Sequence, residues 1–363
     1  MPRLTQLDDV LFPVEEHPVY VSLPGVSGER RVAVPDKKAI VNRNNDRVLG
    51  VVSRAYRLVT NHEALELAYA CCRTVFPETQ PGEWSANAVD APSTAGYCHI
   101  DLVHNSTALD FAFVPAEDRP DAFGPFIRVT NSYNGLRALG FDIGYFRKVC
   151  KNGLIVPDTI IRFKYSHMRS EISDTMQFEV AKERLARFRG VFTDSLAGLR
   201  KCVVARPQFE PLICGVLQLR RPEPASRDEA DWPAIGTHLS AMSDRYAEEL
   251  GENAYAVFNA ITDFASRPLE NRCVHRDRNS LQRLAGTWLT AFNQVSREQT
   301  FSLTRYLEEL AAASAGASGA GTSPGKPSAD PRGRGVSLET VVPELDLAMV
   351  TGVGGVDIDE TLQ

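Results

Sequence analysis

The sequence predicts an α+β fold: an antiparallel β-sheet with a central hairpin, backed by helices and followed by a helical C-terminal part and a disordered tail. The first supporting observation is Phe126–Val156, where two extended runs flank Tyr133-Asn134-Gly135, because Asn-Gly tolerates the positive φ of a type I′ turn. The second is a change to the helical period of 3.6 residues from Met176 to about Val203. The third is the element order: strands, a helix, further strands and then a long helix.

The elements before the hairpin are read from alternation and turn residues. Short extended pieces at Val19–Leu23 and Arg31–Val34 predict a hairpin or edge strands. Apolar residues recur at helical spacing over His62–Phe76, with Asn61 as the expected N-cap and Pro77 as the stop. The other expected strands are Ala39–Asn42, Val48–Val59, Ala95–Val103 and Ala108–Val114, with loops at residues 78–94 and 115–124.

The chain after the hairpin becomes mainly helical. A short strand at Thr159–Tyr165 precedes the long helix, and a Pro-rich stretch with the apolar run Leu212–Leu219 follows it. Three further helical patterns form either a cap on the sheet or a separate bundle; they are Pro233–Leu250, Asn253–Phe264 and Ser280–Ser296. The predicted parts are a sheet domain, a helical cap or small bundle, a flexible linker and an acidic tail peptide, at residues 1–206, 207–311, 312–335 and 336–363.

The composition is that of a water-soluble globular protein, with 43% hydrophobic and 24% charged residues. No apolar run approaches the roughly 18–20 residues of a membrane span, and the first residues lack the pattern of a secretory signal. We therefore expect a cytoplasmic protein with no membrane contact. The seven cysteines include no CxxC pair, which indicates buried thiols in a reducing compartment.

Charge is distributed unevenly along the chain. Residues 126–206 hold 15 Lys and Arg against 7 Asp and Glu, a net charge of +8, whereas residues 336–363 hold 6 acids and no base, a net charge of −6. Such a division suggests a basic working surface and an acidic tail that docks a partner or mimics nucleic acid. The same residues can equally be solvated helix faces and an inert solubility tail.

The segment KAIVNRNNDRVLGVVSRAYRLVTNHEAL, from Lys38 to Leu65, resembles the phage/plasmid-like proteins that contain domain of unknown function 932. Its Val-Val-x-x-x-Tyr step and its helix opening near Asn-x-Glu-Ala carry the resemblance. The hairpin is similar to the family's Asn-Gly turn and Val-Cys-x-Asn-Gly exit, and Asn253–Phe264 and Ser280–Phe292 are similar to its C-terminal segment. The resemblance covers roughly residues 35–300. It implies that the chain is a member of the family. It assigns neither an activity nor catalytic residues, since the family has no agreed function.

The order of helix, antiparallel strands with a hairpin and long basic helix is also that of phage single-strand annealing proteins of the Redβ and Erf type. This likeness is one of element order alone.

Nucleic-acid binding is the first functional hypothesis, because backbone contacts need spaced cations and unpaired bases stack on aromatic rings. Strand alternation places Tyr145 and Arg147 on one face, taken as the contact face, and assigns Phe146 to the core and Cys150 to a structural role. The candidate contacts are cations, amides and rings of the hairpin and the strand after it: Arg128, Asn131, Tyr133, Asn134, Arg137, Tyr145, Arg147, Lys148, Lys151, Arg162 and Lys164. A solvated sheet face with turn-forming Asn residues explains the same pattern.

A metal-dependent nuclease is a second hypothesis, in which Asp101, Asp110 and Asp142 converge on Mg²⁺ from neighbouring strands. Zinc is disfavoured, because Cys98 and His99 are adjacent on a strand and point to opposite faces. No motif for nucleophilic catalysis or phosphate binding is present in the sequence, so we expect no catalytic residue, no metal and no cofactor.

The sequence therefore favours a non-catalytic protein of a phage or plasmid that binds single-stranded DNA, and that anneals strands as a homo-oligomer during recombination or replication. The alternative is an interaction or regulatory protein that docks a host or phage partner through its acidic tail. A nuclease is the second alternative.

Overall fold

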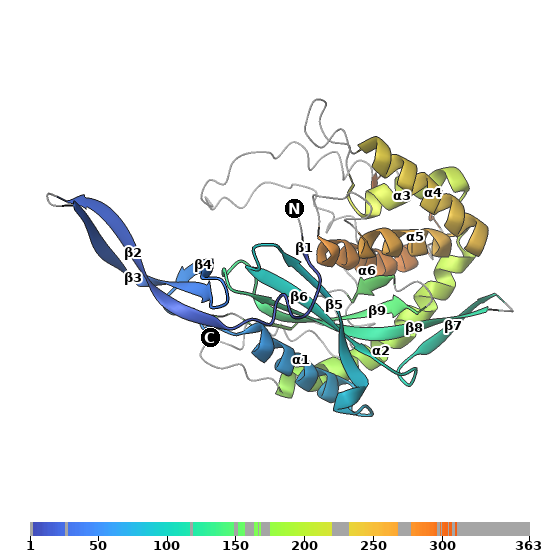
Figure 1. The fold of residues 1–363 in the computed structure, drawn as a ribbon. Helices are drawn as coiled ribbons and strands as arrows, with labels where there is room; N and C mark the ends of the chain where they lie inside the picture. The colour runs from blue at the N-terminus through green and yellow to red at the C-terminus, as the bar shows by residue number, and fades with distance from the viewer. Residues whose placement is uncertain are drawn as a thin grey trace. The chain divides into compact units, whose positions relative to one another are not determined.

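The computed structural model describes residues 3–25, 28–116, 119–148, 152–156, 163–165, 167, 175–219, 232–267, 277–295, 298, 300–303, 305, 306, 309 and 310. Its strands are β1 (Arg3–Leu4), β2 (Val14–Gly25), β3 (Gly28–Asn42), β4 (Arg47–Ser53), β5 (Trp84–Pro92), β6 (Tyr97–His104), β7 (Phe111–Ala116), β8 (Arg119–Ser132), β9 (Leu139–Arg147), β10 (Gly153–Ile155) and β11 (Phe163–Tyr165). Its helices are α1 (Asn61–Val75), α2 (Thr175–Lys201), α3 (Phe209–Val216), α4 (Trp232–Leu250), α5 (Ala254–Ser266) and α6 (Arg278–Val295), with short 3₁₀ helices at Pro81–Glu83 and Arg206–Gln208. Antiparallel sheets combined with helices confirm the predicted α+β class (Figure 1).

The chain divides into two compact units. Unit 1 takes in residues 1–111, 124–145 and 158–185, and unit 2 takes in residues 112–123, 146–157 and 186–363. Strands β8 and β9 each contribute residues to both units, and the predicted boundary at residue 206 falls within unit 2. The predicted linker and acidic tail lie outside the described residues.

A three-stranded sheet in unit 1 has the order β2-β3-β4. Strand β2 pairs with β3 along its whole length, but β4 pairs only with residues Lys37–Asn42 of β3. The remaining parts, Val19–Gly25 and Gly28–Val34, form a two-stranded ribbon that Figure 1 shows extending past β4; we call it the β-arm. The hairpin predicted at this place is therefore confirmed, and both of its strands are longer than predicted.

The eight-stranded sheet has the order β1-β5-β6-β8-β9-β10, with β7 on β8 and β11 on β9. In unit 1, Ile100 on β6 faces Val89 on β5 and Val129 on β8, and all three side chains are buried. Strand β5 lies within the predicted loop 78–94, and β8 begins within the predicted loop 115–124. Both loop predictions were wrong over these residues.

Helix α1 contacts β6 and buries the apolar stripe that includes Ala64, Leu65 and Ala68. Its N-cap is Thr60, not the predicted Asn61, because a capping box forms one residue earlier. The Thr60 hydroxyl accepts from the backbone N–H of Glu63 at 3.1 Å, and the Glu63 carboxylate accepts from the Thr60 N–H at 2.7 Å.

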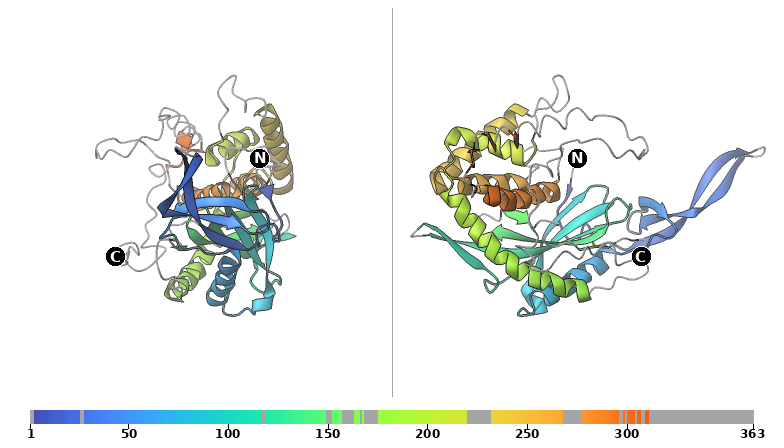
Figure 2. Two further views of the ribbon diagram at one scale, coloured as in Figure 1. Left: turned by 60° about the vertical axis from the view of Figure 1, so that its left-hand side comes forward. Right: turned by 180° about the vertical axis from the view of Figure 1, so that it is seen from behind.

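Helices α3 to α6 belong to unit 2, and Figure 2 shows α5 running beside α4 and α6. Residues Ala254–Ala265 of α5 are buried all round, as expected for a helix at the centre of a bundle. On α6, a Cβ at Gly286 would lie 1.9 Å from the carbonyl oxygen of Ile155, so only glycine permits this approach of α6 to β10. None of the described helices is both long and apolar enough to cross a lipid bilayer.

Candidate nucleic-acid interface

The turn between β8 and β9 packs inside unit 1. Tyr133 is 0% exposed, and its hydroxyl oxygen accepts from the backbone N–H of Asn61 at 2.8 Å, at the start of α1. Burial raises the pKa of Tyr133, against the hydrogen bond from Asn61, which acts to lower it. The Tyr133 ring also packs against Phe12, with 6.0 Å between ring centroids. Tyr133 therefore fastens α1 to the sheet and presents no ring surface to solvent.

Asn134 is held by two glycines. The backbone N–H groups of Tyr133 and Asn134 donate to the carbonyl of Gly96 at 2.8 and 3.3 Å, and a Cβ at Gly50 would lie 2.5 Å from Asn134 Cα. The Asn134 side-chain oxygen accepts from the N–H of Leu136 at 3.1 Å. Gly135 has a positive φ of 71°, but Asn134 has not. The two-residue type I′ turn is therefore wrong, and residues 133–138 form a longer loop.

Asn131 is also buried and structural. Its side-chain N–H₂ donates at 2.9 Å to the carbonyl of Val59 and at 2.9 Å to the side-chain oxygen of Asn61. The Asn61 amide in turn donates to the carbonyl of Val10 at 2.8 Å. This pair of amides satisfies the backbone of the segments that lead into α1, which is a common use of buried Asn.

Arg128 lies across from Asp101 in the register of β8 and β6 and is 1% exposed. Its Nε and Nη2 donate to the two Asp101 carboxylate oxygens at 2.6 and 2.8 Å, a two-point ion pair. Burial acts to lower the pKa of Arg128, but the Asp101 carboxylate outweighs it and the pKa is raised. Arg137, by contrast, is exposed, with its guanidinium 5.3 Å from the ring centroid of Tyr97.

The faces assigned to the second strand of the hairpin are reversed. Tyr145 and Arg147 are 3% and 5% exposed, so they do not form an outer contact face. Phe146 and Lys148 are half-buried, with the Lys148 ammonium 5.3 Å from the Phe146 ring centroid, so Phe146 is not a core residue. The alternation itself was predicted correctly. The inward face accepts the charge of Arg147 because Asp121 neutralises it.

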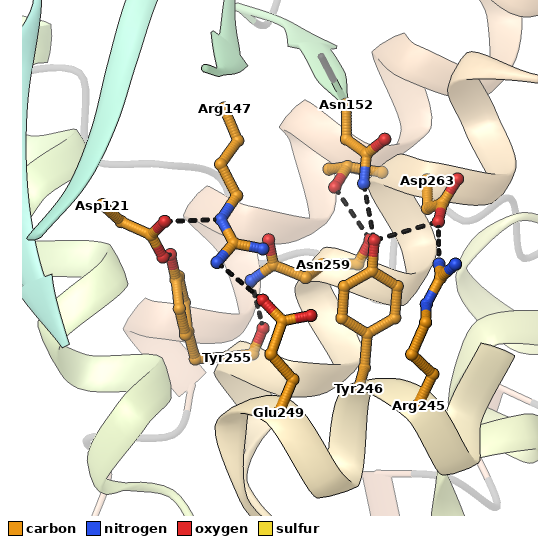
Figure 3. A network of polar contacts seen from close by, with 10 residues as sticks. Asp121, Arg147, Asn152, Arg245, Tyr246, Glu249, Tyr255, Asn259 and Asp263 are labelled. Carbon is orange, nitrogen blue, oxygen red and sulfur yellow. Dashed lines mark hydrogen bonds and ion pairs between the residues drawn. The ribbon is translucent and has the colours of Figure 1, made fainter. Parts of the chain in front are cut away.

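Arg147 is the centre of a polar network in unit 2, drawn in Figure 3. Its Nε donates to Asp121 at 2.7 Å, and its Nη2 donates to Glu249 on α4 at 3.1 Å. The second Asp121 oxygen accepts from the hydroxyl of Tyr255 on α5 at 2.8 Å. Burial first, and then the Asp121 charge, raise the pKa of Tyr255, so this hydroxyl keeps its proton.

The network continues from β10 to α5. The side-chain amide of Asn152 donates to the Tyr246 hydroxyl at 2.7 Å, and that hydroxyl donates to Asp263 at 2.9 Å. Arg245 and Arg267 both form ion pairs with the same Asp263 carboxylate. Figure 3 shows Tyr246 between Asn152 and Asp263. These contacts cross-link elements of unit 2. They also give the buried charges of Asp121, Arg147 and Asp263 partners of opposite charge, because an unpaired buried charge is costly.

The described residues offer little support for metal or thiol chemistry. No group of three or more His, Cys, Asp or Glu side chains suited to a metal ion occurs in this part of the chain, and Asp101 of the nuclease hypothesis is bound to Arg128. Burial raises the pKa of the Cys98 thiol to about 12 and that of Cys214 to about 11, so neither is a thiolate at neutral pH.

The three remaining candidates are not placed. Lys151 and Arg162 lie outside the described residues, and of Lys164 only the backbone, on β11, is described.

Several exposed cations of unit 1 lie on or next to the sheet β2-β3-β4, which the sequence prediction overlooked. On this sheet and directly after β4, four exposed cations of the described residues have neither an ion pair nor a side-chain hydrogen bond, and we call them the free cations: Arg30, Arg31, Lys37 and Arg54. Their neighbours are engaged, since Lys38 pairs with Glu16 at 2.7 Å and Arg43 with Glu15 at 2.9 Å. The sequence did contain one signal for this basic surface: Arg30 and Arg31 are adjacent in one strand of the predicted edge hairpin, and the other strand carries Tyr20.

The fold and these contacts define an α+β protein with an exposed basic β-ribbon and two buried polar clusters. The family model for a domain of unknown function, DUF932, matches residues 48–298, and the chain belongs to this family. No curated protein and no solved structure matches the chain.

Proposed function

We propose that this protein binds nucleic acid without cleaving it, with a preference for single-stranded DNA. The observation that carries the proposal is the set of free cations on the sheet β2-β3-β4, whose side chains are exposed and not neutralised by a neighbouring acid. Unpaired surface cations gain most from phosphate, because they release the counterions condensed on the nucleic acid and lose no existing partner.

The charge of this sheet and its connections supports the proposal. Residues 14–57 hold 8 Lys and Arg and 5 Asp and Glu, a net charge of +3, although the chain as a whole carries −6. Also in unit 1, helix α2 exposes Lys182 from the basic region 126–206. Of the residues first considered, Arg137 and Lys148 keep surface access, but neither belongs to the free cations on which the proposal rests.

The biological setting is part of the proposal. We place the protein in the cytoplasm, in the DNA metabolism of a phage or plasmid, where binding to single strands supports recombination or replication. Annealing of complementary strands by a homo-oligomer is the corresponding activity. The acidic residues 336–363 recruit a protein partner or compete with nucleic acid for the basic surface.

The second candidate function is a regulatory protein without a nucleic-acid partner. The observation that favours it is the net charge of −6 on residues 336–363. A basic surface of another protein can bind this tail as well as the chain's own cations can.

Salt dependence separates the two functions. Fluorescence anisotropy of a labelled thymidine oligonucleotide is measured with the full chain at about 50 mM and about 200 mM salt. Four phosphate contacts give a slope of about −2.8 in log affinity against log salt, which is about a 50-fold loss over this range. Absence of binding at the lower salt, also after removal of residues 313–363, would refute the nucleic-acid proposal. Shortening of the strand when Mg²⁺ or Mn²⁺ is added would contradict its non-catalytic part.

A further inference from the structure

The β-arm has two chemically different faces. Directly paired residues of antiparallel strands share a face, so the pairs Val19–Val34 and Val21–Val32 lie on one side and Tyr20–Ala33 and Ser22–Arg31 on the other. The first side is aliphatic at these two pairs, and the next pair along it, Leu23–Arg30, adds the free cation Arg30. The second carries the only ring of the β-arm together with a free cation. Tyr20 and Arg31 are diagonal neighbours on this second side, which we call the Tyr20–Arg31 face, with their Cα atoms about 7–8 Å apart.

The Tyr20–Arg31 face is open to solvent. Tyr20 is 55% exposed, and Ser22 and Arg31 are exposed as well. Figure 2 (right) shows the β-arm as two strands without a third beside them. A tyrosine that is more than half exposed keeps much of its ring in water, so the ring is available to stack on a planar ligand.

We propose that the Tyr20–Arg31 face binds single-stranded nucleic acid, with one base stacked on Tyr20 and a neighbouring phosphate bound by Arg31. The inference rests on the proposed function and names its contact site. Diagonal neighbours on a β-ribbon are about 7–8 Å apart, so Tyr20 and Arg31 are close enough to contact one and the same strand. An aromatic ring that stacks on a base, together with a cation that binds phosphate, is the combination by which proteins bind single strands regardless of sequence.

A single strand suits this face better than a duplex, because the faces of duplex bases are already stacked on each other and cannot receive Tyr20. The Arg31 guanidinium offers several donors in a plane, which matches a phosphate. On the opposite side, Val19, Val21, Val32 and Val34 offer phosphate no donor. We call these four positions the aliphatic face and use them for comparison, and Arg30 further along that side is left unchanged in all variants.

The test uses the full chain and four variants in the anisotropy assay with the thymidine oligonucleotide. Tyr20→Ala and Arg31→Ala alter the proposed site, and Val21→Thr and Val32→Thr alter the opposite face at exposed positions. We expect Tyr20→Ala to weaken binding about 5- to 100-fold without changing the salt slope. We expect Arg31→Ala to reduce the magnitude of that slope by about 0.7, because one phosphate contact is lost. The two threonine variants should bind like the parent chain.

Two results would overturn the inference while leaving the proposed function intact. The first is parent-like affinity and slope in both Tyr20→Ala and Arg31→Ala. The second is a loss in Val21→Thr equal to that in Tyr20→Ala, which would assign the contact to the aliphatic face. Tighter binding of duplex than of single strand, with the same Tyr20 dependence, would contradict both the inference and the single-strand preference of the proposed function. Failure of the parent chain to bind at low salt would instead refute the proposed function.

Discussion

Arg128 was a candidate nucleic-acid contact, and the structure predicts a different outcome for its removal. In Arg128→Met, the Asp101 carboxylate loses both donors, at 2.6 and 2.8 Å, in a site where Arg128 is 1% exposed. Removing one partner of a buried ion pair costs about 3–5 kcal/mol, because the other charge stays buried without compensation. We expect a loss of that size in the unfolding free energy of unit 1.

The second variant in this experiment removes both charges. In Arg128→Met with Asp101→Leu, apolar side chains of similar length fill the space between β6 and β8, and no charge is left buried. Such replacements are often neutral or stabilising, so the double variant should recover most of the loss. The coupling between the two positions, obtained from the double-mutant cycle, should therefore be large.

Hydrogen exchange followed by mass spectrometry is the appropriate assay, because peptides from β6 and from residues 124–132 of β8 report on unit 1 separately. A loss of about 3–5 kcal/mol accelerates exchange of its slowest amides by about 10²- to 10³-fold or more. Unchanged exchange in Arg128→Met, combined with weaker binding of the oligonucleotide, would refute this reasoning and restore Arg128 as a contact residue.

Three further variants test other contacts. Gly50→Ala brings a Cβ within 2.5 Å of Asn134 Cα and should lower the unfolding free energy, measured in urea, by about 1–3 kcal/mol. The control is Gly82→Ala, whose Cβ would have nothing within 4 Å and should leave the unfolding free energy unchanged. Equal effects of the two substitutions would contradict the close approach. Burial lowers the pKa of His167, against its hydrogen bond to a backbone carbonyl. The unfolded chain therefore binds this proton first, and stability should fall from about pH 7 towards about pH 5 in thermal unfolding, less so in His167→Gln; an identical pH dependence in the two chains would exclude this role. Tyr255→Phe removes the 2.8 Å donor of Asp121 and should cost about 1–3 kcal/mol, and parent-like thermal stability would show that the contact is replaceable.

The parts of the fold that follow from local sequence were predictable. Long helices with periodic apolar residues were found with ends close to the observed ones, and the strand alternation at Tyr145–Lys148 was correct. Strand β5 was missed, because Pro81, Gly82 and Asp90 suggest a loop, and only pairing with β6 makes the segment extended. The N-cap moved to Thr60 because Glu63 completes a capping box, a signal that was present in the sequence.

The candidate site was harder to predict, because burial of a charge depends on partners far away in the sequence. Arg128 is neutralised by a residue 27 positions earlier, and Arg147 by residues 26 and 102 positions away. Sequence spacing does not reveal such pairs, so a count of basic residues includes cations that never reach the surface. The Arg30-Arg31 pair was visible in the sequence, but that these cations are exposed and unpaired follows only from burial and ion pairing.

The central claim is that nucleic acid contacts the β-arm and not the β8–β9 hairpin. The most direct measurement is hydrogen exchange of the full chain with and without a saturating thymidine oligonucleotide. We expect slower exchange in peptides covering Val19–Gly25 and Gly28–Val34, where a two-stranded ribbon exchanges readily in the free chain, and no change over residues 133–148. Slower exchange over residues 133–148 with none in the β-arm would contradict the account.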